Sequence, residues 1–167
     1  MTRRSSVNYL DRLYGVLPYL LPIAAVVVFG AFLFLQFPSL FIVFFPIFKL
    51  NQILSISIID FISIRFVAWF CVFIFLVRSY KVNHFVRFNA MQALLLDIVV
   101  ALVGAITQLL EAILGRVAFF PFMIQIIASV TFLGITAAFL YAIVLCFSGK
   151  YADKIPVISD VAYTQVR

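Results

Sequence analysis

Long apolar stretches with few charged residues constrain this chain more than any other feature of its sequence. Four such stretches cover about residues 13–37, 59–77, 89–111 and 122–147. A helix needs about 20 predominantly apolar residues to cross a bilayer, and each stretch is roughly that long. Hydrophobic residues make up 66% of the chain and charged residues 11%, which excludes a soluble globule because such a protein needs a more charged surface. We predict an all-α membrane protein with four transmembrane helices and short loops.

The four spans leave no room for a separate soluble domain. We therefore treat residues 1–167 as a single membrane domain that ends in a tail over residues 149–167. Gly149 is expected to end the fourth helix, since glycine commonly follows a helix C-terminus. Residues 38–50 are apolar but contain two prolines, so we expect this segment to dip into the bilayer or lie on it rather than cross it.

The residues ahead of the first span have a pattern of their own. Over residues 8–17, apolar side chains recur at helical spacing and polar side chains take the other face. This pattern predicts an N-terminal amphipathic lead-in helix, which bends at Pro18 and Pro22 into the first span. The N-terminus has no short apolar region followed by a small-residue cleavage site, so we expect no signal or transit peptide.

The basic residues lie between the predicted spans instead of forming one patch, which indicates membrane topology and not nucleic acid as a partner. If successive spans alternate in direction, nine basic residues lie on one side of the membrane and three on the other. The positive-inside rule then predicts that both termini face the cytoplasm, or the stroma in a plastid. The nine are Arg3, Arg4, Arg12, Arg78, Lys81, Arg87, Lys150, Lys154 and Arg167, and the three are Lys49, Arg65 and Arg116.

Two charged residues stand inside predicted spans. Arg65 is within about two turns of the start of the second span, so we expect its side chain to reach back to the headgroups. Asp97 is deeper, in a stripe of small and polar residues that share one face of the third span. A carboxylate is costly in lipid, so the stripe is expected to face water in a polar path, or another helix in close contact. The stripe consists of Ala93, Asp97, Ala101, Gly104, Gln108 and Glu111.

Asn89 and Gln92 share a face at the start of the third span, where they are expected to cap the helix or line an entrance. No catalytic constellation accompanies them. His84 is the single histidine, the two cysteines have no metal-ligand spacing, and there is no glycine-rich phosphate loop. We therefore expect no enzyme activity, no metal site and no cofactor.

Four segments resemble, in the same order, the twenty-kilodalton subunit family of the chloroplast inner-envelope protein translocon (TIC), including its cyanobacterial and plastid-encoded relatives. They are residues 12–22, 36–38, 84–98 and 155–167, with the sequences RLYGVLPYLLP, QFP, HFVRFNAMQALLLDI and IPVISDVAYTQVR. The resemblance covers nearly the whole chain. Carried over by position, the family motif falls on His84, Arg87, Phe88, Asn89, Met91, Gln92, Asp97, Pro156, Asp160 and Gln165.

The resemblance implies an integral membrane protein of the plastid inner envelope or a cyanobacterial membrane, with both termini on the stromal or cytoplasmic side. It also implies a channel-core subunit of preprotein import, whose partners are the lipid bilayer, other translocon subunits or further copies of itself, and a translocating preprotein. It brings no catalytic residue.

Two functions of different classes therefore remain open. The chain is either a translocon subunit, in which Asn89, Asp97 and Gln108 face a polar path, or a structural or assembly protein whose polar stripe joins helices. A small-solute transporter is less favoured, because helices broken at mid-membrane are typical of that class and the prolines of the first span lie near its end.

Overall fold

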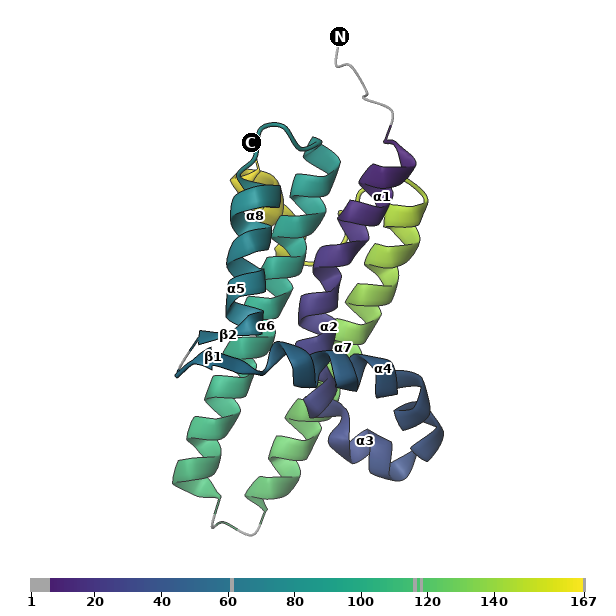
Figure 1. The fold of residues 1–167 in the computed structure, drawn as a ribbon. Coiled ribbons are helices and arrows are strands. Elements are labelled where there is room, and N and C mark those ends of the chain that lie inside the picture. Colours follow the sequence, from purple (N-terminus) through teal and green to yellow (C-terminus); the bar gives the residue numbers. More distant parts are fainter. Residues whose placement is uncertain (1–6, 61, 116, 118, 167) are drawn as a thin grey trace.

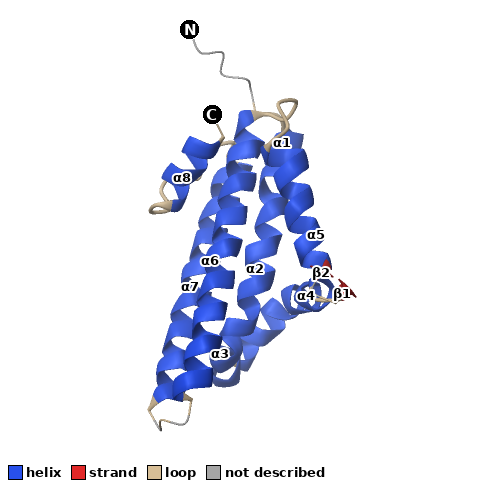
Figure 2. Ribbon diagram, turned by 90° about the vertical axis from the view of Figure 1, so that its left-hand side faces the viewer, coloured by secondary structure: helices blue, strands red, loops and turns tan. Residues whose placement is uncertain are grey.

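The computed structural model describes residues 7–60, 62–115, 117 and 119–166, which form a bundle of long helices with one small hairpin at its side (Figures 1 and 2). Among these residues, three helical segments are long and apolar enough to cross a membrane: Tyr9–Gln36, His84–Leu114 and Phe120–Phe147. The predicted all-α fold is therefore confirmed as a mostly helical one that also has a two-stranded sheet, and three of the four predicted spans have a helix of sufficient length. Four of the basic residues used to predict sidedness lie outside the described residues: Arg3, Arg4, Arg116 and Arg167.

The first long segment is one continuous run of short helical pieces. Asn8 begins it with a capping box, in which its side chain accepts from backbone N–H groups while the Asp11 carboxylate accepts from the Asn8 N–H at 3.0 Å. The predicted lead-in helix is not set apart from the span, because the prolines only tighten the backbone into a 3₁₀ turn. The pieces are α1 (Tyr9–Val16), η1 (Leu17–Tyr19), α2 (Leu20–Val26), η2 (Val27–Gly30) and α3 (Ala31–Gln36).

A short helix and a hairpin follow. Helix α4 (Pro38–Leu54) runs across the bundle rather than along it (Figures 1 and 2). Its 17 residues rise by about 26 Å, which is less than the roughly 30 Å of a bilayer core. Strands β1 (Ser57–Ile59) and β2 (Ile62–Ser63) then pair antiparallel. The hairpin lies partway along the long helices (Figure 1).

The predicted second span, over residues 59–77, is wrong in its extent. Its first residues form the hairpin, and the helix begins only at Ile64, with α5 (Ile64–Cys71) continued by the π-helical η3 (Val72–Val77). Fourteen helical residues rise by about 20 Å, which is less than the roughly 30 Å of a bilayer core. The apolar composition of the stretch hid the hairpin, since its isoleucines suit a strand as well as a helix.

The other two long helices pack against each other (Figure 1). They are α6 (His84–Leu114) and α7 (Phe120–Phe147). Gly149 ends α7 as predicted, with φ of 69°, and the tail then folds back over the start of α6 as α8 (Ile158–Gln165). The start of α1 and helix α8 lie at the same end of the bundle (Figure 1).

Helix α6 is central, because α1, α2, η3, α7 and α8 all pack on it. Its first half is buried, whereas its second half and the facing part of α7 expose large apolar side chains. Leu102 is 57% exposed and Leu109 62% exposed on α6, and Leu133 is 55% exposed on α7. Such exposure indicates a surface that faces lipid.

Candidate functional site: a polar cavity beside the central helix

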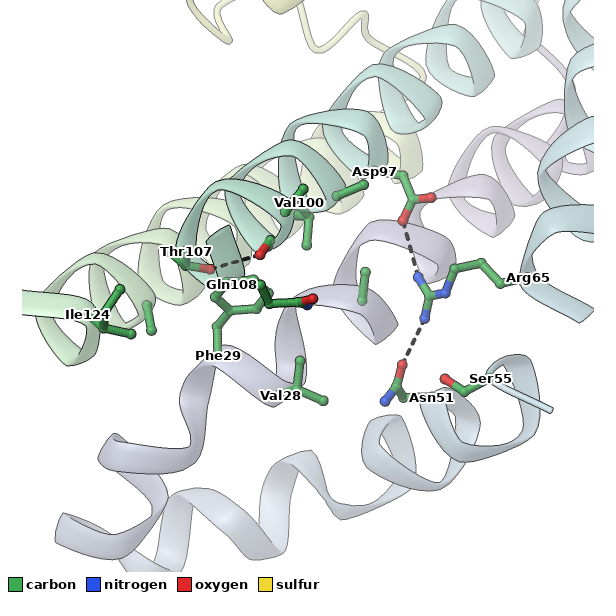
Figure 3. A pocket seen from close by; sticks show the side chains of 15 residues that line it. Val28, Phe29, Asn51, Ser55, Arg65, Asp97, Val100, Thr107, Gln108 and Ile124 are labelled. Carbon is green, nitrogen blue, oxygen red and sulfur yellow. Dashed lines mark hydrogen bonds and ion pairs between the residues drawn. The ribbon is translucent and has the colours of Figure 1, made fainter. Parts of the chain in front are cut away.

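A cavity of about 580 Å³ lies between α6, α7, η2, α4 and α5. Its wall on α6 includes the middle four residues of the predicted stripe, Asp97, Ala101, Gly104 and Gln108, of which Asp97 and Gln108 are labelled in Figure 3. The other polar walls come from elements close in space but distant in sequence: Asn51 on α4, Ser55 directly after α4, and Arg65 on α5. The stripe therefore faces a cavity with polar groups, although Ala93 and Glu111 do not line it.

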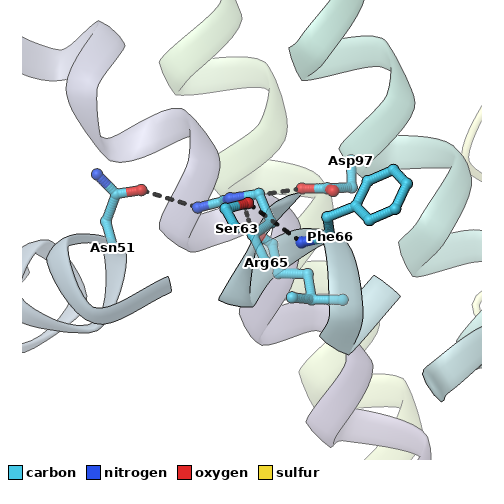
Figure 4. Close-up of polar contacts among 6 residues, drawn as sticks. Asn51, Ser63, Arg65, Phe66 and Asp97 are labelled. Carbon is cyan, nitrogen blue, oxygen red and sulfur yellow. Dashed lines mark hydrogen bonds and ion pairs between the residues drawn. The ribbon is translucent and has the colours of Figure 1, made fainter. Parts of the chain in front are cut away.

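An ion pair closes one end of this cavity. The Arg65 Nη1 lies 3.2 Å from Asp97 Oδ1 and also donates to the Leu21 carbonyl at 3.0 Å, while Nη2 donates to Asn51 Oδ1 at 2.8 Å (Figure 4). The two charged side chains are 20% and 9% exposed. Arg65 therefore points into the protein, and the prediction that it reaches back to the headgroups is wrong.

The start of α5 explains why Arg65 has this position. The Ser63 hydroxyl caps the helix by accepting from the Phe66 N–H at 3.3 Å, which places Arg65 in the first turn, partway along the bundle. A buried charge is costly unless it is paired and hydrogen-bonded. Asp97 supplies the opposite charge, and Asn51 and a backbone carbonyl supply the remaining acceptors, so the pair leaves this end of the cavity with no net charge.

Small residues and free polar groups make up the rest of the α6 wall. A Cβ atom on Gly104 would lie 3.4 Å from the Phe29 ring, in ordinary van der Waals contact, so a side chain larger than that of alanine would crowd Phe29. The Thr107 hydroxyl donates back to its own helix. Within the part of the chain that the structure describes, the Gln108 amide forms no hydrogen bond, and its side chain is exposed at the cavity wall. Glu111, one turn further on, is exposed as well.

Asn89 and Gln92 do not belong to this cavity. Both are fully buried at the start of α6, where the Tyr19 hydroxyl donates to Gln92 Oε1 at 3.0 Å and lies 3.3 Å from Asn89 Oδ1. Gln92 Nε2 in turn donates to the Ala152 carbonyl at 2.9 Å and to Ser159 Oγ at 3.1 Å. The prediction that these residues cap the helix or line an entrance is wrong, because they connect the first helix and the tail to α6.

The remaining motif residues of α6 lie around this second polar cluster, which consists of Tyr19, Asn89, Gln92 and Ser159. His84 Nδ1 lies 3.2 Å from the Tyr151 hydroxyl, and the Phe88 ring packs 4.4 Å from that of Tyr163. Arg87 Nε donates to the Val77 carbonyl at 2.9 Å and so joins the end of η3 to α6. Met91 packs against a neighbouring apolar cluster.

The motif residues of the tail have structural positions. The Pro156 carbonyl accepts from the Ile158 N–H at 2.7 Å where α8 begins. Asp160 lies in the first turn of α8, where a carboxylate interacts favourably with the helix dipole. Gln165 ends the helix and is exposed. The tail motif therefore shapes α8 and its docking on α6.

Sequence reasoning missed the partners of both polar clusters. Tyr19, Asn51 and Ser159 were not singled out, and Arg65 was assigned a surface role. Tyr19, Arg65 and Ser159 lie far along the chain from the α6 residues that they contact, and Asn51 is 14 positions from Arg65. No local spacing pattern therefore indicates these contacts. Among the described residues, no three His, Cys, Asp or Glu side chains come together as metal ligands.

Comparison with known protein families matches residues 4–162 to a family described as the Tic20-like chloroplast import apparatus. A Tic20 family protein of Synechocystis sp. is 35% identical over 168 residues, which cover 100% of this chain and 99% of the relative. The chloroplastic protein TIC 20-II of Arabidopsis thaliana is 32% identical over 158 residues, 93% of this chain and 72% of its own length. The Tic20 family protein Ycf60 of Porphyra purpurea is 31% identical over 172 residues, 99% of this chain and 80% of the relative.

These matches confirm the resemblance read from the motifs. The family match includes all of the long helices and both polar clusters, and the relatives come from a cyanobacterium and from plastid-bearing organisms. This chain belongs to the Tic20-like family, whose members are membrane proteins linked to chloroplast protein import.

Proposed function

We propose that this protein is an integral membrane subunit of a protein translocon, and that its polar cavity contacts the translocating polypeptide as part of a channel core. The cavity between α6, α7 and α4 is the observation that carries this proposal. A translocating chain needs hydrogen-bonding groups inside the bilayer, because unpaired backbone groups are costly in hydrocarbon. Asn51, Ser55 and Gln108 offer such groups beside the neutral ion pair.

The size of the cavity implies partners. A volume of about 580 Å³ is that of an ordinary ligand pocket, which measures about 300–1,000 Å³, so it holds a short stretch of polypeptide but not a continuous path. Other translocon subunits or further copies of this chain would complete the path. The protein would need no enzyme activity and no cofactor for this role.

The proposed topology has four crossings, with η3, α5 and the adjoining hairpin forming the second. Both termini would then lie on the stromal or cytoplasmic side of a plastid inner envelope or cyanobacterial membrane, as the positive-inside rule favours. In support, the starts of α1 and α6 and the end of α7 lie at one end of the bundle (Figure 1). The basic residues in or next to these segments are Arg12, Arg78, Lys81, Arg87, Lys150 and Lys154.

Photo-crosslinking tests the contact with a polypeptide. A photoreactive amino acid replaces Gln108 in the cavity wall, and the matched control places it at Leu109, which is 62% exposed on the same helix and does not line the cavity. Each variant is assembled into its native membrane, and a labelled precursor is arrested during translocation by a folded domain at its end. We expect crosslinks to the precursor from position 108 and not from position 109.

The same experiment distinguishes the translocon subunit from the alternative, a structural or assembly protein. A structural or assembly protein would crosslink at position 108 to a fixed neighbouring subunit, whether or not a precursor is present. Absence of any precursor crosslink from position 108, with the precursor arrested and the variant assembled, would contradict the translocon proposal.

A further inference from the structure

Arg65 connects four elements at the edge of the cavity. Its guanidinium binds Asn51 on α4, the Leu21 carbonyl on α2 and Asp97 on α6, while Arg65 itself belongs to α5 (Figure 4). Helices α4 and α5 form the outer wall of the cavity through Asn51, Ser55 and Arg65. This single side chain therefore holds the outer wall against the two helices behind it.

The outer wall is bounded by two irregular joints in the backbone. Pro46 lies inside α4, where a proline lacks the N–H of a helical hydrogen bond and weakens the helix. At the other end, α5 passes into the π-helix η3, a rare form that is found frequently at functional sites. The part of α4 before Pro46 is held by aromatic packing, since the ring of Phe44 lies 5.1 Å from that of Phe132 on α7. The segment between the two joints can thus turn while its flanks stay in place.

Apolar contacts alone do not hold this segment strongly in a bilayer. Leu54 and Trp69 pack against a cluster that contains Leu21 and Leu94, but lipid tails are as apolar as leucine and can replace such contacts at little cost. On their outer sides the helices already expose Ile53 and Phe66, at 55% and 50%. The hydrogen bonds of Arg65 are the contacts that lipid cannot replace.

We propose that Arg65 is a positioning residue, a clasp that holds the outer wall of the cavity against α2 and α6. When the clasp is released, the second half of α4 and α5 turn outward about Pro46 and η3, and the cavity widens toward the lipid. Its use, the exit of an apolar segment of the translocating chain into the bilayer, rests on the proposed function. The opening itself rests only on the geometry of the clasp and its joints.

Distances between spin labels test the opening in the absence of any translocating chain. Labels on cysteines that replace Phe70 on α5 and Leu133 on α7 are measured by pulsed electron paramagnetic resonance in nanodiscs, with Cys71→Ser removing the exposed native thiol. Arg65→Gln removes the clasp. Arg65→Gln with Asp97→Asn removes it without leaving an unpaired carboxylate. We expect both variants to populate a longer distance roughly tenfold or more over the wild type, since each hydrogen bond to a charged group contributes at least that factor.

Two controls make the result specific. Lys49→Gln removes a cation of α4 whose side chain donates to Gln52 and lies over the ring of Phe45 on the same helix, and it should leave the distances unchanged. Asp97→Asn alone keeps an acceptor for Arg65 and should stay closed. A second label pair, on Leu102 of α6 and Leu133 of α7, reports whether the bundle is intact. An unchanged distance from α5 in the double variant, with that second pair also unchanged, would overturn the clasp.

The outcome of the crosslinking experiment at position 108 is independent of the outcome of the distance measurement. If the wall opens in the double variant while no precursor crosslinks from position 108, the clasp stands and the translocon role falls. If the precursor crosslinks but the wall does not open, the translocon role stands and the clasp falls.

Discussion

The docking of the tail on α6 offers a prediction whose size can be worked out from the structure. Ser159 is 1% exposed, and its hydroxyl donates to the Ala152 carbonyl at 3.0 Å. The same oxygen accepts from Gln92 Nε2 and from the Ile155 N–H, each at 3.1 Å. Ser159→Ala removes all three interactions.

Each of these hydrogen bonds contributes about 1 kcal/mol net. The Ala152 carbonyl keeps its bond from Gln92 at 2.9 Å, so it is not left without a partner, whereas the Ile155 N–H loses its acceptor. The expected loss is about 2 to 3 kcal/mol of docking free energy, which corresponds to roughly a 30- to 150-fold rise in the population of the released tail.

Trypsin cleavage after Lys154, followed by mass spectrometry in nanodiscs, measures that population, because cleavage tracks the open form when opening is fast. Thr164→Ala is the matched control: its hydroxyl is also in α8 but is exposed and bonds only to the Val161 carbonyl. Equal cleavage rates for the two variants would refute the assignment of the buried cluster to tail docking.

Three further predictions concern packing, strain and pH. Gly104→Leu should crowd Phe29, which already lies 3.4 Å from the position of an added Cβ, and should lower the thermal stability in detergent by roughly 1–3 kcal/mol. Gly134→Ala is the control, because the space around Gly134 is open and the variant should keep its stability. Equal melting temperatures of the two variants would count against the packing of Gly104 on Phe29. Gly149→Ala should destabilise the junction after α7 by about 1 kcal/mol or more, because the residue has φ of 69° and the Arg12 side chain 3.3 Å away; unchanged cleavage of the tail would oppose this. Burial, with the charges of Asp153 and Tyr151, raises the pKa of Tyr163 above its usual 10.0. The docked tail therefore favours the protonated phenol, and this contribution to docking should be lost as the pH rises beyond about 10. A Tyr163→Phe variant that releases its tail at the same alkaline pH as the wild type would contradict the role of the Tyr163 hydroxyl.

The three long helices were predictable because their apolar runs are long and their ends carry local signals, such as Gly149 after α7. The face of α6 toward the cavity was predictable for the same reason, since Asp97, Ala101, Gly104 and Gln108 follow the helical repeat. Both inferences need only residues close together in the sequence.

The remaining features depend on contacts between distant residues. Arg65 and Asp97 are 32 positions apart, and an arginine near a predicted span end looks the same whether its partner is a headgroup or a buried carboxylate. Gln92 and Ser159 are 67 positions apart, so the polar residues at the start of α6 gave no sign that a tail would cover them. The hairpin between β1 and β2 was hidden by its apolar composition.

Access of water to the cavity tests the central claim most directly. A polar path must be accessible to water, whereas polar residues that only join helices need not be. Single cysteines that replace Ala101, in the cavity wall, and Leu102, on the exposed face of α6 outside it, are treated with a small charged thiol reagent in sealed proteoliposomes. Cys71→Ser removes the exposed native thiol, and Cys146 is buried. We predict that position 101 reacts and position 102 does not, since the charged reagent is excluded from lipid. An unreactive position 101, in protein that is folded and reconstituted, would contradict the polar cavity as part of a translocation path.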